Sequence, residues 1–271
     1  MHETAYAKVN LALHVRAREA DGYHRLETVF AFAQDGDTLE VAEPHAPGEV
    51  ELELVGPFAA LLQGEPNNLV LRAAAALRNL YGVSRGALLR LDKRLPVAAG
   101  IGGGSADAAA ALRLLVRWWD LPREPAQLHR IARDLGADVP ACLGSVAVRG
   151  DARGDLLTPI EDASLTGRPL LLVNPRVPVP TGPVFAAWDG VDRGPLGAGL
   201  LGRNDLEAPA RIIAPAVGDV LAALDGAPFA GMSGSGATCL GLYDRIEDRD
   251  AAAARIAAAH ADWWLLVTRL R

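Results

Sequence analysis

A glycine-rich stretch near the middle of the chain, LPVAAGIGGGSADAAAAL at 95–112, constrains this sequence more than any other segment. Glycines at 100, 102, 103 and 104 stand directly before Ser105 and an alanine-rich run with helical spacing. Glycine lets a backbone adopt positive φ and approach a ligand closely, and the first N–H groups of a helix, with its dipole, favour an anion. The stretch therefore predicts a loop that leads into a helix N-terminus and binds phosphate.

Three common nucleotide-binding signatures do not fit this stretch. A Walker A loop ends in Gly-Lys-Ser/Thr, whereas Gly104 is followed by Ser105 and Ala106. A dinucleotide fingerprint starting at 100 or 102 would need glycine at 105 or 107, where the chain has Ser and Asp. The protein-kinase signatures His-Arg-Asp and Asp-Phe-Gly are absent. On this stretch alone, a glycine-rich surface linker before an ordinary helix remains an alternative.

Composition excludes several classes of protein. The 271 residues, 50% of them apolar, predict one or two globular domains. The chain has no apolar run of the roughly 18 residues that a membrane span needs, and its start, MHETAYAKVN, lacks the features of a secretory signal, so we expect a cytoplasmic protein without a membrane partner. A net charge of −6 argues against nucleic-acid binding. Cys142 and Cys239 are expected to be buried free thiols, and the scattered histidines predict no metal site.

Hydrophobic periodicity predicts a mixed α and β opening part. We expect strands at 5–16, near 27–33, 38–43 and 49–55, with short polar turns between them, and another at 86–92. Helical spacing predicts helices at 67–81, from Ser105 to about Trp119, and at about 124–135, followed by a helical turn that starts at Asp138.

The composition shifts near residue 155, where we place a boundary between domains 1–155 and 156–271. The apolar run LLLV predicts a strand in the second domain, and a Pro/Gly-rich patch covers 175–202. A helix at 208–225, a strand pair at 229–243, a helix at 249–261 and a final strand in WWLLVTRL predict an α/β sandwich with antiparallel strands. The paired tryptophans at 118–119 and 263–264 are assigned to packing.

The glycine loop, Pro-x-x-x-Gly-Ile-Gly-Gly-Gly-Ser at 96–105, resembles the signature loop of the GHMP small-molecule kinases. Five more segments resemble that family in the same order along the chain: AYAKVNLAL at 5–13, DGYHRLETVF at 21–30, GADVPACL at 136–143, VNPRVPVPTGPVF at 173–185 and MSGSGATCLGL at 232–242. Each block is short, but their joint occurrence in order is hard to reach by chance, so the chain is identified as a member of the family. It departs from the family pattern at Ile101, Ala106 and Asp107, where members often have Leu, Ser and Asn.

The resemblance implies a two-domain α+β GHMP kinase fold, with an N-terminal unit like ribosomal protein S5 domain 2 and a ferredoxin-like C-terminal unit. It implies an enzyme that uses ATP and Mg²⁺, acts on a small-molecule substrate, and is a monomer or weak homodimer. The family branch that matches best phosphorylates the 2-hydroxyl of 4-diphosphocytidyl-2-C-methyl-D-erythritol in the non-mevalonate route to isoprenoid precursors.

The resemblance also assigns a catalytic pair. Phosphoryl transfer to an alcohol needs a group that accepts the hydroxyl proton and a local positive charge. Asp138 matches the family's catalytic aspartate, and Lys8 lies in its first strand motif. From the residues alone, Asp138 is equally well explained as the N-cap of a helix before Pro140, and Lys8 as a solvated charge on a strand.

The remaining assignments concern nucleotide and substrate. The resemblance implies that two aromatic rings, Tyr23 and Phe185, sandwich the cytosine while His24 reads its polar edge, with Asn10 and Thr181 as polar contacts; either aromatic alone is as well explained by core packing. Two of the residues expected to line the adenine side have alternative explanations that are almost as good: Lys93 as a lysine at a strand end, and Asn68 as a helix cap. The residues expected to bind ATP are Pro96, Val97, Ala98, Ala99, Gly100, Ile101, Gly102, Gly103, Gly104, Ser105, Ala106, Lys93 and Asn68.

Two alternative functions stay open at this point. One is another GHMP kinase, acting on mevalonate, homoserine or a sugar; the Gly-Tyr-His segment at 22–24 and Phe185 oppose it. The other is a catalytically silent nucleotide-binding or RNA-binding protein of the same fold. Retention of both Lys8 and Asp138, together with the acidic charge balance, opposes that reading.

Overall fold

The computed structural model describes all 271 residues, and they form two compact units that interleave along the chain. Two long strands, β1 (His2–Arg18) and β2 (His24–Ala42), contribute residues to both units. The first unit comprises Met1–Ala7, Asp35–Val97 and Gly102–Ser145, and the second comprises Lys8–Gln34, Ala98–Ile101 and Val146–Arg271.

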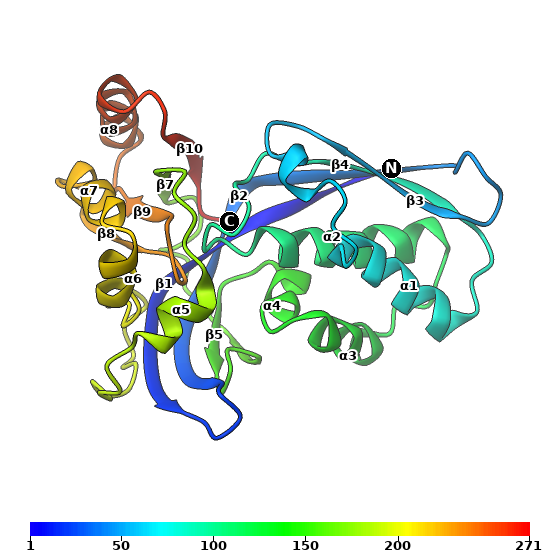
Figure 1. The fold of residues 1–271 in the computed structure, drawn as a ribbon, viewed down its shortest axis with the longest axis horizontal. Coiled ribbons are helices and arrows are strands. Elements are labelled where there is room, and N and C mark those ends of the chain that lie inside the picture. Colours follow the sequence, from blue (N-terminus) through cyan, green and yellow to red (C-terminus); the bar gives the residue numbers. More distant parts are fainter. The chain divides into compact units, whose positions relative to one another are not determined.

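A sheet and four helices make up most of the first unit. β4 (Ala87–Asp92) pairs in parallel with β3 (Val50–Val55) and antiparallel with residues 38–42 of β2. The helices gather on one side of this sheet (Figure 1), where they bury a mainly alanine and leucine core. They are α1 (Leu69–Tyr81), α2 (Gly103–Trp118), α3 (Pro125–Leu135) and α4 (Val139–Gly144), and a short 3₁₀ turn, η1, covers Ala59–Leu62.

One continuous strand, β2, replaces the two strands predicted at 27–33 and 38–43. The intervening polar residues, QDGD at 34–37, do not turn. A Cβ atom on Gly36 would lie 1.9 Å from the Ala5 carbonyl oxygen, so glycine here permits close approach of two backbones. Asp37 is fully buried and its polar atoms are paired within the unit, which removes the need for a solvated turn.

The first two helices follow from local capping signals. Asn68 caps α1, since its Oδ1 accepts a hydrogen bond from Val70 N at 2.9 Å, and Gly82 ends the helix in the left-handed conformation. The predicted helix after Ser105 begins two residues earlier, at Gly103, with Gly102 at φ 64° as its N-cap. Gly103, Gly104 and Ser105 are therefore helical residues rather than loop residues.

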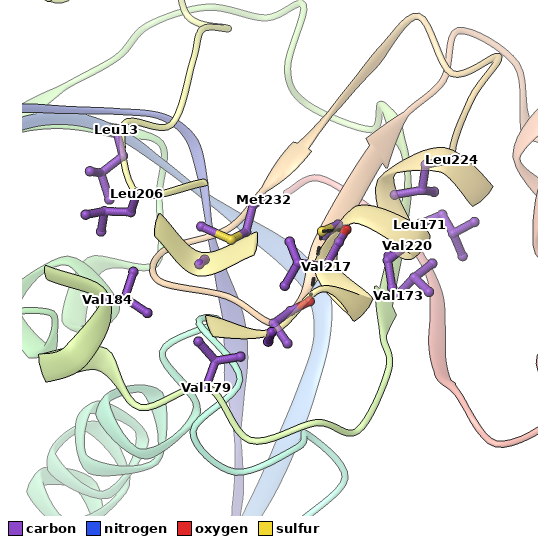
Figure 2. Close-up of a cluster of buried hydrophobic side chains, with 14 of the residues drawn as sticks. Leu13, Leu171, Val173, Val179, Val184, Leu206, Val217, Val220, Leu224 and Met232 are labelled. Atoms are coloured by element: carbon purple, nitrogen blue, oxygen red, sulfur yellow. Dashed lines mark hydrogen bonds between the residues drawn. The ribbon is translucent and has the colours of Figure 1, made fainter. Parts of the chain in front are cut away.

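The second unit contains a four-stranded antiparallel sheet in the order β10-β7-β9-β8. Its core is the apolar cluster of Figure 2, in which Leu171 and Val173 of β7 and Cys239 of β9 meet side chains from α7 and α8. The elements are β7 (Pro169–Asn174), β8 (Phe229–Met232), β9 (Cys239–Leu242), β10 (Trp264–Arg269), α7 (Ala216–Ala223) and α8 (Ile246–Ala259). This arrangement confirms the predicted strand pair at 229–243 and the final strand.

Two short strands that lie on either side of residue 155 also belong to this unit. β5 (Val148–Asp151) pairs with residues 28–30 of β2, and β6 (Leu156–Pro159) pairs with β5. Strand pairing thus crosses the boundary predicted near residue 155, and β5 was missed because four residues carry little periodicity. The domain limits 1–155 and 156–271 stay a prediction.

The helix predicted at 208–225 is two helices, α6 (Glu207–Ile213) and α7. Pro215 has no N–H for a helical hydrogen bond and disfavours helical geometry at the preceding residue, and Ala214 indeed has φ −135° and ψ 88°. The Pro/Gly-rich patch holds one short helix, α5 (Thr181–Ala186). None of the helices is long and apolar enough to cross a membrane, and both cysteines are buried free thiols, as predicted.

Candidate active site

In the second unit, Lys8 and Asn10 lie side by side on β1, as two residues on the same face of a strand must. Lys8 is 3% exposed, and its Nζ donates a hydrogen bond to Asn10 Oδ1 at 3.1 Å and lies 4.4 Å from the centre of the Phe30 ring. Burying an ammonium is costly without polar partners. Lys8 is therefore not the solvated surface lysine that its strand position alone allows.

Asn10 is held in place by two further hydrogen bonds, one of which is extended by a third. Its Nδ2 donates to Thr28 Oγ1 at 2.8 Å, and that hydroxyl donates to the Ala12 carbonyl at 2.6 Å. The Asn10 backbone N–H donates to Ser233 Oγ at 3.1 Å. Because the backbone N–H and the side-chain Nδ2 of Asn10 are both paired, its Oδ1 has one orientation, which faces Lys8.

The segment 98–101 of the glycine loop packs against the second glycine-rich motif, at 232–238, within the same unit. Ser233 Oγ donates to the Gly100 carbonyl at 2.8 Å, and Lys8 N donates to the Ile101 carbonyl at 3.0 Å. Gly100 has φ 76°, and a Cβ atom there would lie 2.4 Å from the Ser233 carbonyl oxygen. Only glycine fits here. Its contacts hold this part of the loop in one conformation, so it is not a flexible linker.

The first unit holds the other end of the loop over a buried ion cluster, which comprises Asp37, Lys93 and Asp107. Lys93 Nζ donates to Asp37 Oδ2 at 2.6 Å and to Asp107 Oδ2 at 2.7 Å, and all three side chains are at most 3% exposed. A Cβ atom on Gly103 would lie 3.0 Å from Lys93 Nζ. The cluster thus lies directly beneath the first residue of α2.

Burial and neighbouring charges shift the pKa values in this cluster. Burial raises the pKa of Asp107 from 3.8, Lys93 lowers it and Asp37 raises it again, with a net result of about 7. Burial by itself lowers the pKa of Lys93, but the two carboxylates outweigh burial and raise it. The ammonium of Lys93 is enclosed and doubly paired, and its backbone N–H and carbonyl are bonded to Val55 and Phe58, so its contact with adenine stays a prediction. Asn68 likewise has a structural task, as the cap of α1.

Asp138 stands immediately before α4, also in the first unit, and its half-buried side chain makes no capping hydrogen bond to that helix. The N-cap explanation of this aspartate is therefore not supported by the local geometry. Arg113 of α2 fixes the other end of α4, because its Nη1 donates to the Cys142 and Leu143 carbonyls at 2.7 and 3.2 Å. Lys8 and Asp138 belong to different units, and their cooperation stays a prediction.

On the substrate side, the second unit brings His24 and Phe185 together. Their ring centres are 5.0 Å apart, and His24 also meets Trp188 edge to face at 5.8 Å. Arg18 Nε donates to His24 Nε2 at 3.2 Å, which leaves the ring proton on Nδ1. Burial, and then the charge of Arg18, lower the pKa of His24 below 6.5, so the imidazole is neutral at neutral pH.

The other two predicted substrate residues are exposed. Tyr23 is 58% exposed, and the Arg153 guanidinium lies 4.2 Å from its ring centre. Tyr23 thus meets Arg153, whereas Phe185 meets His24. Thr181 Oγ1 is 3.0 Å from Ser235 Oγ, so α5 begins beside the second glycine motif.

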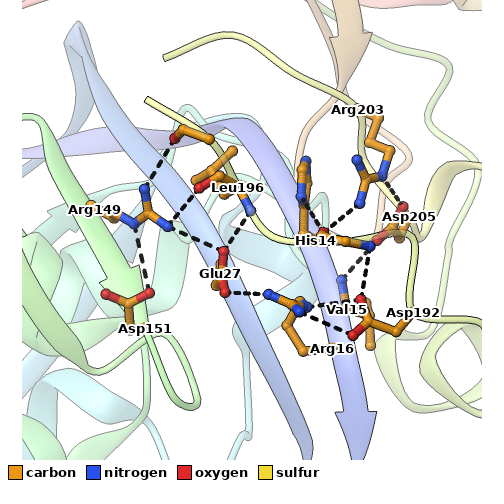
Figure 3. Close-up of polar contacts among 12 residues, drawn as sticks. His14, Val15, Arg16, Glu27, Arg149, Asp151, Asp192, Leu196, Arg203 and Asp205 are labelled. Atoms are coloured by element: carbon orange, nitrogen blue, oxygen red, sulfur yellow. Dashed lines mark hydrogen bonds and ion pairs between the residues drawn. The ribbon is translucent and has the colours of Figure 1, made fainter. Parts of the chain in front are cut away.

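An ion-pair network fastens the chain that follows Trp188 to β1 and β2 (Figure 3). Glu27 receives hydrogen bonds from Arg16, Arg149 and the Leu196 N–H, and Arg16 also pairs with Asp192. Further along, Asp205 accepts from the Val15 N–H at 2.9 Å. These contacts lie in the same unit as His24 and hold the chain on the C-terminal side of Phe185 and Trp188.

Sequence reasoning missed several residues of this arrangement. Arg18, Thr28 and Ser233 all lie in or beside segments that resemble the family, but nothing in a single sequence separates them from surface polar residues. Asp37 was read as part of a turn, and Trp188 lies in a Pro/Gly-rich patch without periodicity. No group of three or more His, Cys, Asp or Glu side chains is arranged to hold a metal ion.

Comparisons with known proteins identify the family and agree with this fold. The family profile "GHMP kinases N terminal domain" matches residues 68–145, and "GHMP kinases C terminal" matches residues 192–263. The chain belongs to the GHMP kinase family and has its two-domain α+β fold, as predicted. Mevalonate kinase, at 10% identity and a TM-score of 0.73 over the whole chain, shares this fold.

Within the family, the chain groups with the 4-diphosphocytidyl-2-C-methyl-D-erythritol kinases. Proteins of that name from Rhizorhabdus wittichii and Sphingopyxis alaskensis are 57% and 53% identical to it, and each comparison covers 100% of this chain and 96% or 99% of the relative. A crystal structure of 4-(cytidine 5'-diphospho)-2C-methyl-D-erythritol kinase is 32% identical, with a TM-score of 0.83 over 100% of this chain and 99% of the other.

Proposed function

We propose that this chain transfers the γ-phosphoryl group of ATP to the 2-hydroxyl of 4-diphosphocytidyl-2-C-methyl-D-erythritol, in the non-mevalonate route to isoprenoid precursors. The observation that carries the proposal is the buried Lys8, hydrogen-bonded to Asn10 and joined through its own N–H to Ile101 of the glycine loop. A buried cation beside the glycine loop can stabilise the negative charge that develops during phosphoryl transfer, which supports a catalytic over a silent protein. Full-length relatives at 57% and 53% identity carry the corresponding name.

The proposed chemistry uses two side chains. Asp138 accepts the proton of the 2-hydroxyl, the oxygen forms a bond to the γ-phosphorus, and the bond from that phosphorus to the β–γ bridging oxygen breaks, which releases ADP. Lys8 stabilises the negative charge that develops on the attacking oxygen, an effect that is strongest where water is excluded. Its 3% exposure fits that task.

The proposed nucleotide site is the loop from Pro96 to Ala106. Free N–H groups of the first turn of α2 face the phosphates, and the helix dipole adds to their attraction. Because Ala106 has no hydroxyl, the remaining donors in this turn are backbone N–H groups and Ser105. Gly102 at φ 64° makes the turn into the helix possible.

We propose that Mg²⁺ enters with the ATP phosphates. Mg²⁺ keeps several waters and binds substrate phosphates more readily than an all-protein cage. The absence of a carboxylate cluster of metal-binding size is compatible with this arrangement. The ion, when bound, neutralises charge on the phosphates, while the residues of this chain orient the alcohol and remove its proton.

The cytidine part of the substrate is proposed to bind at His24, Phe185 and Tyr23. A neutral His24 with its proton on Nδ1 offers one hydrogen-bond donor to a polar base edge, and Phe185 offers an aromatic face. Asn10 and Thr181 contact the erythritol or the diphosphate. We further propose a cytoplasmic monomer or weak homodimer, with no nucleic-acid or membrane partner.

The test is the identity of the product. Purified protein is incubated with ATP, Mg²⁺ and the cytidylylated erythritol, and in parallel with mevalonate, homoserine or galactose. Mass spectrometry should detect one added phosphoryl group on the cytidylylated substrate alone, and ³¹P–¹³C coupling should locate it at the 2-position. Phosphorylation of one of the other alcohols instead would replace the proposal with a different GHMP kinase, and no transfer to any of them would support a silent protein.

A further inference from the structure

The buried ion cluster of Asp37, Lys93 and Asp107 connects both ends of the glycine loop within the first unit. Asp37 Oδ1 accepts hydrogen bonds from the N–H groups of Arg94 and Leu95, at 2.6 and 2.8 Å, where the chain enters the loop. Asp107 is one helical turn after Gly103, where the chain leaves it. Lys93 joins the two carboxylates, so the cluster sets the distance between the start and the end of the loop.

The cluster carries an unbalanced charge when both carboxylates are ionised. One ammonium then faces two carboxylates, which leaves a net charge of −1 in a site with almost no solvent contact. Moreover, Asp107 Oδ1 is buried and has no hydrogen-bond partner. An ionised carboxylate with an unpaired buried oxygen is unfavourable, and a proton on Asp107 removes the net charge of the cluster.

The exposed guanidinium of Arg94 interacts with Asp37, but solvent screens that charge and it does not act on Asp107. Asp107 is faced by Lys93, which follows β4, and by Asp37, on β2. The helices that also pack on α2 bury apolar side chains and one thiol: Val70, Ala73, Ala74 and Leu77 of α1, Ile131, Ala132 and Leu135 of α3, and Val139, Pro140, Ala141 and Cys142 of α4. Electrostatic interactions are strong in such surroundings because little water screens them.

We propose that Asp107 is a proton-linked positioning residue of the nucleotide loop, and that binding of the triphosphate is coupled to uptake of a proton from solvent by its carboxyl group. The inference rests on the proposed function of the loop. Phosphate charge placed at the N-terminus of α2 is repelled by a net negative cluster beneath Gly103 and is not repelled by a neutral one. Burial and Asp37 already raise the pKa of Asp107 to about 7, so a modest further rise on binding changes its protonation near neutral pH.

The test is the pH dependence of ATP binding in the wild-type protein and in Asp107→Asn. Asparagine has nearly the same shape, can still accept from Lys93, and cannot titrate. A rise of about one unit in the pKa of Asp107 corresponds to a tenfold difference in ATP affinity between its two protonation states. We therefore expect the wild-type Kd for ATP, measured by calorimetry from pH 6 to pH 9, to rise about tenfold more than the Kd of Asp107→Asn. ATP itself also titrates, and the Kd profile of Asp107→Asn gives the part of the pH dependence that comes from ATP.

A second readout is the number of protons taken up. Calorimetry at pH 7.5 in two buffers of different ionisation enthalpy should show proton uptake by the wild-type protein that exceeds the uptake by Asp107→Asn. Parallel Kd profiles and equal proton uptake would overturn the inference while the proposed function stands, because ATP would still bind and product would still form. If Asp107→Asn does not fold, absence of proton uptake by the wild-type protein overturns it. Failure to bind ATP at any pH would overturn both proposals.

Discussion

The residue with the most to explain is Asp138, because its position before α4 suits a helix cap but its side chain does not cap. If it is the base, Asp138→Asn should lower kcat by roughly 10²-fold or more and leave the affinity for ATP nearly unchanged, since the lost interaction acts in the transition state. The measurement is a steady-state assay with a calorimetric Kd for ATP. Asp134→Asn, at an exposed position on α3, is the matched control. Turnover near the wild-type value in folded Asp138→Asn would remove the base assignment.

Arg18 contributes to the lowered pKa of His24 in the proposed cytidine site. In Arg18→Met the hydrogen bond to Nε2 and the nearby positive charge are lost, so the pKa of His24 should rise towards 6.5 while burial, the larger cause, keeps it below that value. Histidine ring signals in an NMR titration report this directly. Arg16→Met removes the same charge from the same strand but has no contact with His24. Equal pKa values of His24 in the two variants would contradict the role given to Arg18.

At the scale of elements, the start of α2 is constrained by what lies under it. Gly103→Ala places a Cβ 3.0 Å from the buried Lys93 Nζ, whereas Gly104→Ala places one in ordinary contact, 3.7 Å from Leu69 Cδ1. Alanine is favoured over glycine in a helix by up to about 1 kcal/mol. Denaturant unfolding should therefore show Gly104→Ala as stable as the wild-type protein or more so, and Gly103→Ala as less stable. The reverse order of stabilities would mean that Lys93 moves away from the added Cβ atom at little cost.

The continuity of β2 depends on one glycine. A Cβ at Gly36 would lie 1.9 Å from the Ala5 carbonyl oxygen, so Gly36→Ala must separate the two strands or bend one of them. Overpacking of this kind costs about 1–3 kcal/mol or more of unfolding free energy. Gly197→Ala, where nothing lies within 4 Å of the added atom, should change stability by less than about 0.5 kcal/mol. Equal stabilities in chemical denaturation would show that the strands are not in such close contact.

For the whole molecule, the buried cluster makes stability depend on pH. The pKa of Asp107 is about 7 in the folded protein and 3.8 as the reference for the unfolded chain, so between these values the folded state binds more protons. The stability that this group contributes is complete below about pH 4 and is lost as the pH rises towards 7. Urea unfolding should therefore show Asp107→Asn gaining stability relative to the wild-type protein between pH 5 and pH 8. The exposed Asp225→Asn should show no such trend. If the difference in unfolding free energy between Asp107→Asn and the wild-type protein stays constant with pH, the raised pKa of Asp107 is contradicted.

Local sequence signals determined much of this protein. Asn68 and Gly82 delimit α1 because capping depends on neighbours in the chain. The alternating residues of β1 predict a strand because the side-chain period of a strand is two. The six family segments led to the fold and the family. Failures came where a local rule competed with a distant contact, as at QDGD in β2, or where a single Pro215 divided an apolar run.

Only the tertiary structure decided which polar groups are paired. Lys93 meets Asp37 across 56 positions of sequence, and Phe185 meets His24 although one lies on α5 and the other on β2. No local pattern encodes such pairs, because the cost of burying a charge and the gain from its partner arise only when the segments pack. The sequence alone thus predicted that a glycine-rich loop precedes α2. Packing decided that this loop stands on a buried lysine between two carboxylates, since dehydration of those charges is tolerable only where all three meet.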